Sequence, residues 1–367
     1  MRLALALKLE ADGELHLASS STGSGGLCQY TKDAGSRIEG ERIPVVAEVH
    51  IVKDVEGGYP ELQPLRFSPR HLDGLVARRL RAWQMRLRTS QAKTTLLGIP
   101  DLELRSRSMG RHLMECSGNS REARFGMLSV ADWAGVPMGT LLDRLGTLSG
   151  SSRILVSGFD HYPQASASAV EGASWIFTTD QLQSSGAFLA LEMNGEALKK
   201  VHGAPVRLLM PGWYGCSSIK WVNEISVVAA DAPATSQMQE FASRTHQQGV
   251  PKLARDFRPA VIQEGAMPVR VEKWTVLGNI KYRVVGILWG GSEPVKALQN
   301  RCNPEEDYVA VDTFSETPND PWSFWSHVGT PKAPGTYAMR LRVSEPVMAA
   351  KRLGAGFFVR SVEISEV

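Results

Sequence analysis

AFLALEMNGEALKKVHGAPVRLLMPGWYGCSSIKWVNEISV, residues 187–227, holds three β-rich runs separated by turns that contain Gly or Pro. Residues 111–116 (RHLMEC) and 152–159 (SRILVSGF) also have strand-like patterns. Residues 136–146 have apolar residues at helical spacing, and residues 178–183 (TTDQLQ) suggest a brief second helix. Strands therefore dominate, with short helices among them. This mixture predicts an α+β domain and argues against a parallel βαβ sheet.

Residues 269–367 have a different sequence pattern. Short strands recur there with turn signals at intervals of roughly ten residues, and helical periodicity is almost absent. This spacing predicts a β-sandwich of immunoglobulin-like type. The sequence therefore suggests three parts: an N-terminal segment of unknown role (1–60), a mixed domain (61–255) and the sandwich (256–367).

Length, composition and charge exclude several classes of protein. A chain of 367 residues with 43% hydrophobic content can bury a substantial core. The net charge of +3 argues against nucleic acid as the main partner, and no apolar run is long enough to predict a membrane span. Basic residues are nevertheless concentrated between Arg66 and Arg111. This cluster is either a solvated surface or a cationic wall around an anionic ligand.

Cysteine spacing and the N-terminus bear on redox chemistry and compartment. Cys28, Cys116, Cys216 and Cys302 are far apart, with no CxxC or CxxCH pattern. Zinc ribbons, thioredoxin-type redox pairs and covalently attached haem therefore lose their usual signature. The opening MRLALALKLEADGEL has too short an apolar region for a secretory signal. We expect a periplasmic protein if a leader has been removed, and a cytoplasmic one otherwise.

HLMECSGNSREARFG, residues 112–126, sets Cys116 at the end of a strand-like run, before a turn and two arginines, Arg121 and Arg124. Turn amides and guanidinium groups favour a thiolate, so we expect a lowered pKa for Cys116. A nucleophilic thiolate needs a histidine base, and spacing singles out none of the histidines. A single thiolate cannot hold zinc alone, but it can hold a metal whose other ligands come from a cofactor.

A second group of polar residues lies within residues 202–227. Backbone amides exposed by Gly, hydroxyl donors and fixed cations are the parts that phosphate recognition needs. Arg207 and Lys220 each interrupt an apolar run, where an unpaired charge is costly. The alternative is that both are ordinary surface charges. The candidate phosphate-binding residues are His202, Arg207, Ser217, Ser218 and Lys220.

The blocks 114–146 (MECSGNSREARFGMLSVADWAGVPMGTLLDRLG) and 187–227 together resemble the sulfite oxidase family of molybdopterin enzymes. That family includes sulfite dehydrogenases, the sulfane dehydrogenase catalytic subunit and plant-type nitrate reductases. The resemblance runs from about residue 66 to the C-terminus. It implies a sulfite-oxidase-like mixed molybdopterin-binding catalytic domain at 61–255, followed by an immunoglobulin-like domain at 256–367. In the family the latter commonly forms the interface of a homodimer.

The resemblance also implies roles for individual residues. Cys116 matches the one protein ligand to molybdenum, beside the dithiolene sulfurs of a single molybdopterin. Arg121 matches a substrate-pocket cation, and His71 matches the histidine of an upstream family motif. Pro69 stands where that motif has its substrate arginine, with Arg70 beside it. The expected cofactor-binding residues are His71, Asp160, His202, Arg207, Ser217, Ser218 and Lys220.

Two departures from the family lie near the expected pocket. Many sulfite-oxidising members carry a Tyr soon after the segment that matches Lys220, and residues 231–249 contain none. Arg244 and His246 either line the pocket in its place or belong to a linker. Cys216 stands where members usually have another residue, and we expect a buried neutral thiol.

The resemblance predicts a molybdenum-dependent oxidoreductase that transfers an oxygen atom to a small sulfur oxyanion, with sulfite as first candidate. Its two electrons would pass to an external acceptor, a c-type cytochrome or oxygen, because the chain carries no haem signature. Three alternatives stay open. The same cofactor could act on a sulfane sulfur, nitrate or a sulfoxide; Cys116 could be the nucleophile of a metal-free hydrolase; or the chain could be a non-catalytic binding module.

Overall fold

The computed structural model describes the residues of two compact units. Unit 1 comprises residues 1–62, 120–126 and 262–367, and unit 2 comprises residues 63–119 and 127–261. The residues described are 4–9, 15–20, 28–30, 46–48, 83–120, 125–146, 152–160, 173–276, 279–291, 297–302, 306–315, 321–343, 353, 356 and 358–367.

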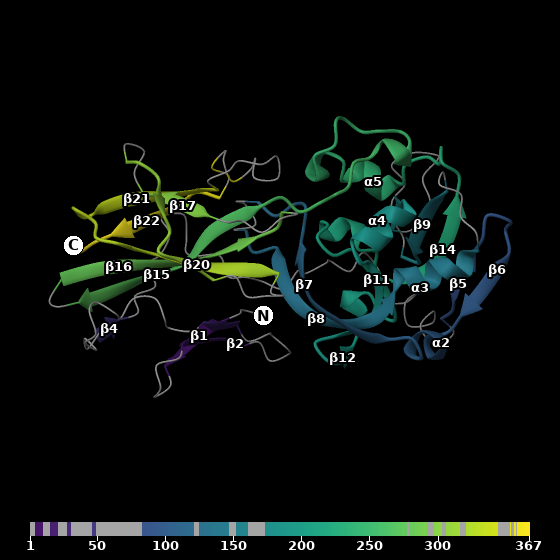
Figure 1. Cartoon of the computed structure of the whole chain (residues 1–367), viewed down its shortest axis with the longest axis horizontal. Coiled ribbons are helices and arrows are strands. Elements are labelled where there is room, and N and C mark those ends of the chain that lie inside the picture. The colour runs from purple at the N-terminus through teal and green to yellow at the C-terminus, as the bar shows by residue number, and fades with distance from the viewer. Residues whose placement is uncertain are drawn as a thin grey trace. The chain divides into compact units, whose positions relative to one another are not determined.

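Unit 2 contains two mixed or antiparallel sheets, which Figure 1 shows in blue to green. The first has the strand order β10-β9-β14-β5-β6. Only its β14–β5 pair is parallel. On β5, Met85 and Leu87 are buried while Arg86 and Arg88 are exposed, as expected of a strand with one face on the core. The bounds are β5 Met85–Arg88, β6 Thr94–Leu97, β9 Arg153–Gly158, β10 Ser174–Phe177 and β14 Val222–Val228.

The second sheet of unit 2 has the order β12-β11-β8-β7, with β13 pairing with β11 as well. Its central strand β11 has four consecutive buried residues, Phe188 to Leu191, because both of its faces are covered. Gly135 on β8 permits this close pairing, since a Cβ there would lie 2.0 Å from the carbonyl oxygen of Leu189. The bounds are β7 Arg107–Glu115, β8 Leu128–Pro137, β11 Phe188–Met193, β12 Glu196–Ala197 and β13 Arg207–Leu209.

Short helices connect these strands, and both helices expected from the sequence are confirmed. One begins at Met138 and ends at Gly146, whose φ of +82° stops it. The other begins after Thr178, whose hydroxyl accepts the N–H of Gln181, while the Gln181 side chain accepts the N–H of Thr178. The α-helices are α2 Ile99–Glu103, α3 Met138–Leu142, α4 Thr179–Ser184 and α5 Ser236–Glu240. The 3-10 turns are η1 Asp143–Leu145, η2 Lys200–His202, η3 Gly215–Ser217, η4 Ser243–Thr245 and η5 Ala254–Asp256.

Unit 1 consists of strands over most of its described residues. Its sheets have the orders β1-β2-β3, β19-β20-β16-β15-β4 and β18-β17-β21-β22. The bounds of the first six strands are β1 Ala4–Leu9, β2 Leu15–Ser20, β3 Cys28–Tyr30, β4 Val46–Glu48, β15 Gly265–Val276 and β16 Asn279–Trp289. The others are β17 Leu298–Arg301, β18 Val309–Ala310, β19 Thr313–Ser315, β20 Trp322–Gly329, β21 Gly335–Val343 and β22 Arg360–Ile364.

Large aromatic side chains form the core of unit 1. Trp289 on β16 contacts Phe358 edge to face, with ring centroids 5.2 Å apart, and Phe358 also contacts Phe125 at 5.2 Å. The indole N–H of buried Trp325 donates to the carbonyl oxygen of Ile287 at 3.1 Å. These contacts join the start of β22 to β16, so the two larger sheets share one core.

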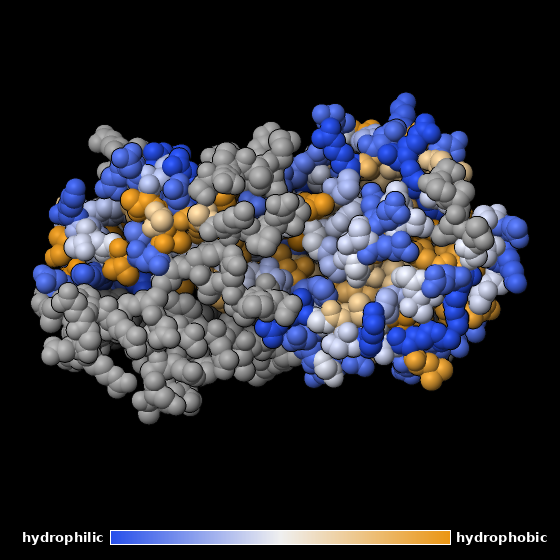
Figure 2. All heavy atoms as spheres, viewed as in Figure 1, coloured by the Kyte–Doolittle hydropathy of each residue, from blue (hydrophilic) through white to orange (hydrophobic). Residues whose placement is uncertain are grey.

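The surface of unit 2 is mainly hydrophilic on the face that Figure 2 shows, over α3, α4 and α5. The large apolar side chains of these helices, such as Leu141, Leu182 and Met238, are buried instead. Among the helices that the structure describes, none is long and apolar enough to cross a membrane.

Candidate functional site

Cys116 directly follows β7 and begins a turn that leaves the sheet. Its N–H donates to the carbonyl oxygen of Met127 at 2.9 Å, and the N–H of Asn119 donates to the carbonyl oxygen of Cys116 at 2.8 Å. The buried Asn119 side chain donates to the Glu115 carboxylate at 3.0 Å and accepts the N–H of Met127 at 3.1 Å. These hydrogen bonds tie the end of β7 to Met127, the residue before β8, so the thiol has a fixed position.

The electrostatics of Cys116 differ from the expectation. Burial is the largest influence and raises the pKa of the thiol, although the Gly118 N–H at 3.4 Å from Sγ and the charge of Arg244 both lower it. The prediction of a lowered pKa is therefore wrong for the chain without a metal. The amide and the cation act in the expected direction, but desolvation outweighs them. A bound metal cation would supply the missing stabilisation of the thiolate.

A second thiol, Cys216, lies on η3 beside the turn that holds Cys116. Burial, with a smaller contribution from the neighbouring Cys116, raises the pKa of Cys216 to about 12. The expected buried neutral thiol is confirmed. The Gln237 side chain donates to the carbonyl oxygen of Cys216 and accepts the N–H of Ser174 at 3.0 Å. Among the described cysteines, Cys116, Cys216 and Cys302 are free thiols.

Basic side chains converge in the block 202–220, as expected. Arg207 on β13 is 1% exposed, and its guanidinium donates to the carbonyl oxygens of His202 at 3.0 Å and Ser218 at 3.2 Å. The Lys220 ammonium donates to the carbonyl oxygen of Val201 at 2.7 Å. Both cations are therefore inside the protein and held by backbone carbonyls, so the alternative of ordinary surface charges is wrong.

Mutual repulsion and burial weaken the charges of this basic cluster, which we define as His202, Arg207 and Lys220. Burial lowers the pKa of Arg207 to about 9. Burial, followed by the charge of Arg207, lowers the pKa of Lys220 to about 7, and Asp160 partly opposes this. Burial, followed by Arg207, Lys220 and Lys199, lowers the pKa of His202 to about 4. A buried anion would relieve this repulsion, so the cluster fits the phosphate of a nucleotide-like or pterin cofactor.

Gly203 allows the basic cluster to be this compact. Its φ is +105°, and a Cβ at this position would lie 2.9 Å from the Cβ of Lys220 and 3.1 Å from the Cβ of Arg207. Both the backbone conformation and the lack of space require glycine here. The sequence alone did not single out Gly203.

The remaining described candidates hold loops at the site. The Ser217 hydroxyl donates to the carbonyl oxygen of Tyr214 at 2.8 Å, and the Ser218 hydroxyl accepts the N–H of Met210 at 3.1 Å. The buried Asp160 carboxylate accepts the N–H of Ala173 at 3.0 Å. In the chain without ligand, these polar groups therefore stabilise the loops that carry the basic cluster.

Three candidate residues lie outside the described residues: Arg70, His71 and Arg121. Their roles stay predictions.

Besides Gly203, sequence reasoning missed Trp133 and Gln237, which also support the site. The guanidinium of Arg207 lies over the ring of Trp133 on β8, 5.6 Å from the centroid, which stabilises the buried cation. Gln237 on α5 links η3 to β10 through its side-chain amide. Neither residue is close in sequence to the group that it contacts, so no local pattern could have found it.

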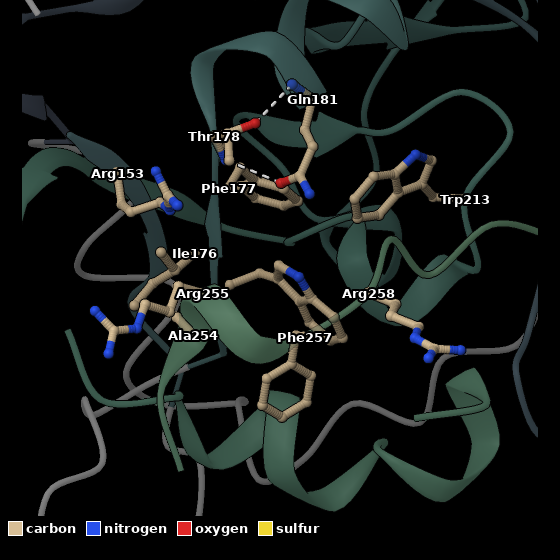
Figure 3. A pocket seen from close by; sticks show the side chains of 11 residues that line it. Arg153, Ile176, Phe177, Thr178, Gln181, Trp213, Ala254, Arg255, Phe257 and Arg258 are labelled. Carbon is tan, nitrogen blue, oxygen red and sulfur yellow. Dashed lines mark hydrogen bonds between the residues drawn. The ribbon is translucent and has the colours of Figure 1, made fainter. Parts of the chain in front are cut away.

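A small surface pocket of unit 2 lies apart from these residues (Figure 3). Its aromatic walls, Trp175, Phe177, Trp213 and Phe257, are each more than nine-tenths buried, so they offer little apolar surface to a ligand. The other lining residues are Arg153, Ile176, Thr178, Gln181, Ala254, Arg255 and Arg258. None of the predicted site residues lines this pocket.

Comparison with known proteins identifies the class of the site. Residues 73–236 match the family of the oxidoreductase molybdopterin binding domain. Cys116 and the basic cluster lie within this range. The cofactor of the domain is molybdenum with molybdopterin, and the buried cations and fixed thiol fit such a group.

Curated relatives specify the family further. The chain is 30% identical over 142 residues to the mitochondrial sulfite oxidase of Macaca fascicularis, covering 35% of this chain and 26% of that protein. It is 28% identical over 174 residues to the sulfite oxidase of Gallus gallus, covering 42% and 37%. It is 31% identical over 102 residues to the NADPH nitrate reductase of Beauveria bassiana, covering 28% and 11%. The matched regions thus span well under half of each relative.

A solved structure supports the same fold. The sulfane dehydrogenase SoxCD from Paracoccus pantotrophus superimposes with a TM-score of 0.54 and 19% identity, covering 78% of each chain. Residues 73–236 therefore match the molybdopterin binding domain and are similar to parts of sulfite oxidases, and the solved structure shows a similar fold for the chain.

Proposed function

We propose that this protein is a molybdenum-dependent oxidoreductase that transfers an oxygen atom to a small sulfur oxyanion, with sulfite as its first candidate substrate. Two electrons then pass to an external acceptor. The observation that carries the proposal is the joint presence in unit 2 of a fixed thiol, Cys116, and the buried basic cluster. The first suits a soft metal and the second an anionic cofactor.

The described residues can hold the cofactor at its two ends. Cys116 would be the protein ligand to molybdenum, and Arg207 and Lys220 would bind the phosphate. When bound, the molybdenum supplies the two-electron redox chemistry of oxygen transfer. His202, whose pKa is about 4, is neutral at neutral pH and can donate a hydrogen bond without adding charge. Asp160 keeps one negative charge near Lys220 and so limits the repulsion within the cluster.

The residues around Cys116 orient the reacting centre. Asn119 fixes the turn, and the Gly118 N–H and Arg244 favour negative charge at Sγ. Among the residues that the structure describes, the groups that shift the pKa of Cys116 include no histidine. A metal-free hydrolase with Cys116 as nucleophile therefore lacks support for its general base.

The substrate is the less constrained part of the proposal. The relatives named above include sulfite oxidases, a nitrate reductase and a sulfane dehydrogenase, and for this chain we propose oxygen exchange with a small anion. We propose Arg121 and Arg70 as further cations for that anion, on the resemblance alone. For the acceptor we propose a c-type cytochrome, because the sequence has no CxxCH pattern of its own.

For unit 1 we propose an immunoglobulin-like sandwich that pairs two copies of the chain. Its two larger sheets share one core through Trp289 and Phe358, which supports a sandwich. Sedimentation of the purified protein tests the pairing: a dimer is expected, and a monomer at micromolar concentration would contradict it.

The function is tested by measuring molybdenum per chain and sulfite-dependent reduction of ferricyanide. We expect close to one molybdenum per chain, activity in the native protein and loss of activity in Cys116→Ser. Cys302→Ser, which changes a free thiol of unit 1, serves as the control and should stay active. Thiosulfate is compared in the same assay as an alternative electron donor. Nitrate and dimethyl sulfoxide accept electrons, so they are compared in a separate assay that follows the oxidation of a reduced viologen. A native protein without molybdenum that is inactivated by thiol alkylation would replace the proposal with the hydrolase.

A further inference from the structure

Arg244 is an exposed cation in the segment that follows α5. Its guanidinium lies over the ring of Phe241, 5.3 Å from the centroid. Among the residues that the structure describes, no acidic side chain pairs with it. The aromatic ring therefore stabilises the guanidinium, but its positive charge is not neutralised.

The guanidinium of Arg244 and the thiol of Cys116 both border the space beside Gly118, which has no side chain to fill it. A Cβ on Gly118 would lie 3.7 Å from Sγ of Cys116 and 4.0 Å from Nη1 of Arg244. Both atoms thus flank the same small space, and the Gly118 N–H donates to Sγ from its edge. A thiol, a backbone N–H and a guanidinium surround this space on three sides.

The backbone that carries Arg244 is held in place. The Thr245 hydroxyl donates to the carbonyl oxygen of Phe241 at 2.9 Å, and the N–H of Gln247 donates to the carbonyl oxygen of Ala242 at 3.0 Å. The Gln247 side chain also accepts the N–H of Arg258 at 2.8 Å and donates to its carbonyl oxygen at 3.0 Å. Arg244 is therefore presented from a fixed turn, which argues against a linker role for this segment.

We infer that Arg244 binds the oxyanion substrate beside Cys116. The inference rests on the proposed function, since it takes Cys116 as the metal ligand. A guanidinium offers several planar N–H donors, which match two oxygens of a sulfur oxyanion. Arg244 is exposed while Cys116 is partly buried, so an anion from solvent can reach the guanidinium.

This assignment gives the segment 231–249 a role that its lack of Tyr had left open. The evidence that assigns this role to Arg244 does not extend to His246. The backbone of His246 is left-handed, with φ of +60°, and its ring lies 6.2 Å from that of Tyr214. The substrate cation of the described residues is therefore Arg244, and His246 packs on the loop before η3.

The test compares Arg244→Gln and Arg244→Lys with the native holoenzyme, using Arg255→Gln as control. Arg255 is exposed on the neighbouring η5 and is paired loosely with Asp256 at 3.9 Å. Three quantities are measured for each protein: molybdenum per chain, the dissociation constant of sulfate by calorimetry, and the KM of sulfite. We expect Arg244→Gln to weaken sulfate binding and raise the KM by about tenfold or more, with molybdenum unchanged. Lysine should restore part of the loss, since it keeps the charge without the planar donors.

A second variant, Gly118→Ala, fills the space between Sγ and Nη1 without backbone strain. It should weaken sulfate binding several-fold while molybdenum is retained. Unchanged sulfate affinity and KM in Arg244→Gln would overturn the inference and leave the proposed function standing. Loss of molybdenum in step with sulfate binding would also overturn it, by making Arg244 a support of the cofactor. If the native protein contains no molybdenum, the proposed function fails, and sulfate binding to the metal-free chain still decides whether Arg244 binds an anion.

Discussion

Lys220 and Arg207 donate to consecutive backbone carbonyls, those of Val201 and His202, at 2.7 and 3.0 Å. Two residues that are distant in sequence thus bring their charges to the same turn, η2. Gly203, which follows this turn, passes between their side chains. The cluster is therefore a preorganised anion site. The free-energy cost of burying its positive charges close together is present before an anion binds.

This cost predicts how the stability of the cofactor-free protein depends on pH. The pKa of Lys220 is about 7 in the folded chain against an ordinary 10.5, so the folded state binds fewer protons between these values. Stability must therefore rise with pH above about 7, because the unfolded state holds the extra proton. Between pH 6 and pH 9 we expect a gain of roughly 2–3 kcal/mol from this group. Denaturant unfolding of protein from cells that cannot make molybdopterin measures it.

The control for this pH dependence is Lys220→Met, which keeps the length of the side chain but removes the charge. Its stability should change much less between pH 6 and pH 9, because His202 and Arg207 have pKa values of about 4 and 9, near or beyond the ends of that range. An equal gain in unfolding free energy in the native protein and in the variant would show that groups other than Lys220 cause the pH dependence.

Gly203→Ala tests whether the compactness of the basic cluster requires glycine. The new methyl group would lie 2.9 Å from the Cβ of Lys220, in a backbone conformation with φ of +105°. We expect a loss of about 2–4 kcal/mol in unfolding free energy, together with a lower molybdenum content. Gly195→Ala is the matched control: its φ is +74°, but a Cβ there meets nothing within 4 Å. Similar losses in the two variants would mean that backbone strain alone explains the effect.

Local patterns predicted the secondary structure around the site well. The strand that ends before Cys116, the helix at 178–183 and the stop at Gly146 are determined by neighbouring residues, so a single sequence shows them. The buried position of Arg207 could also be predicted, because a charge within an apolar run must find partners inside the protein.

Contacts between distant segments could not be predicted in the same way. The pKa of Cys116 depends on how deeply its turn is buried, and the local sequence showed only the amides and cations that lower it. The approach of Arg244 depends on the packing of α5 and η4 around residue 118, more than a hundred positions earlier. Desolvation and long-range packing are properties of the fold, so only the structure could reveal them.

Asn119→Ala should release the turn that carries Cys116. The Asn119 amide bridges Glu115 and Met127 on opposite ends of the excursion from the sheet, at 3.0 and 3.1 Å, and is almost fully buried. Removing it leaves the Met127 N–H and the Glu115 carboxylate without this partner, which costs about 1–3 kcal/mol. We also expect Cys116 of the cofactor-free variant to react several-fold faster with iodoacetamide, because the loosened turn exposes the thiol. Asn194→Ala removes a comparable bond from Asn194 to the N–H of Asp132, at an exposed turn. It should leave the alkylation rate of Cys116 unchanged, and equal acceleration in both variants would show that Asn119 does not fix the thiol.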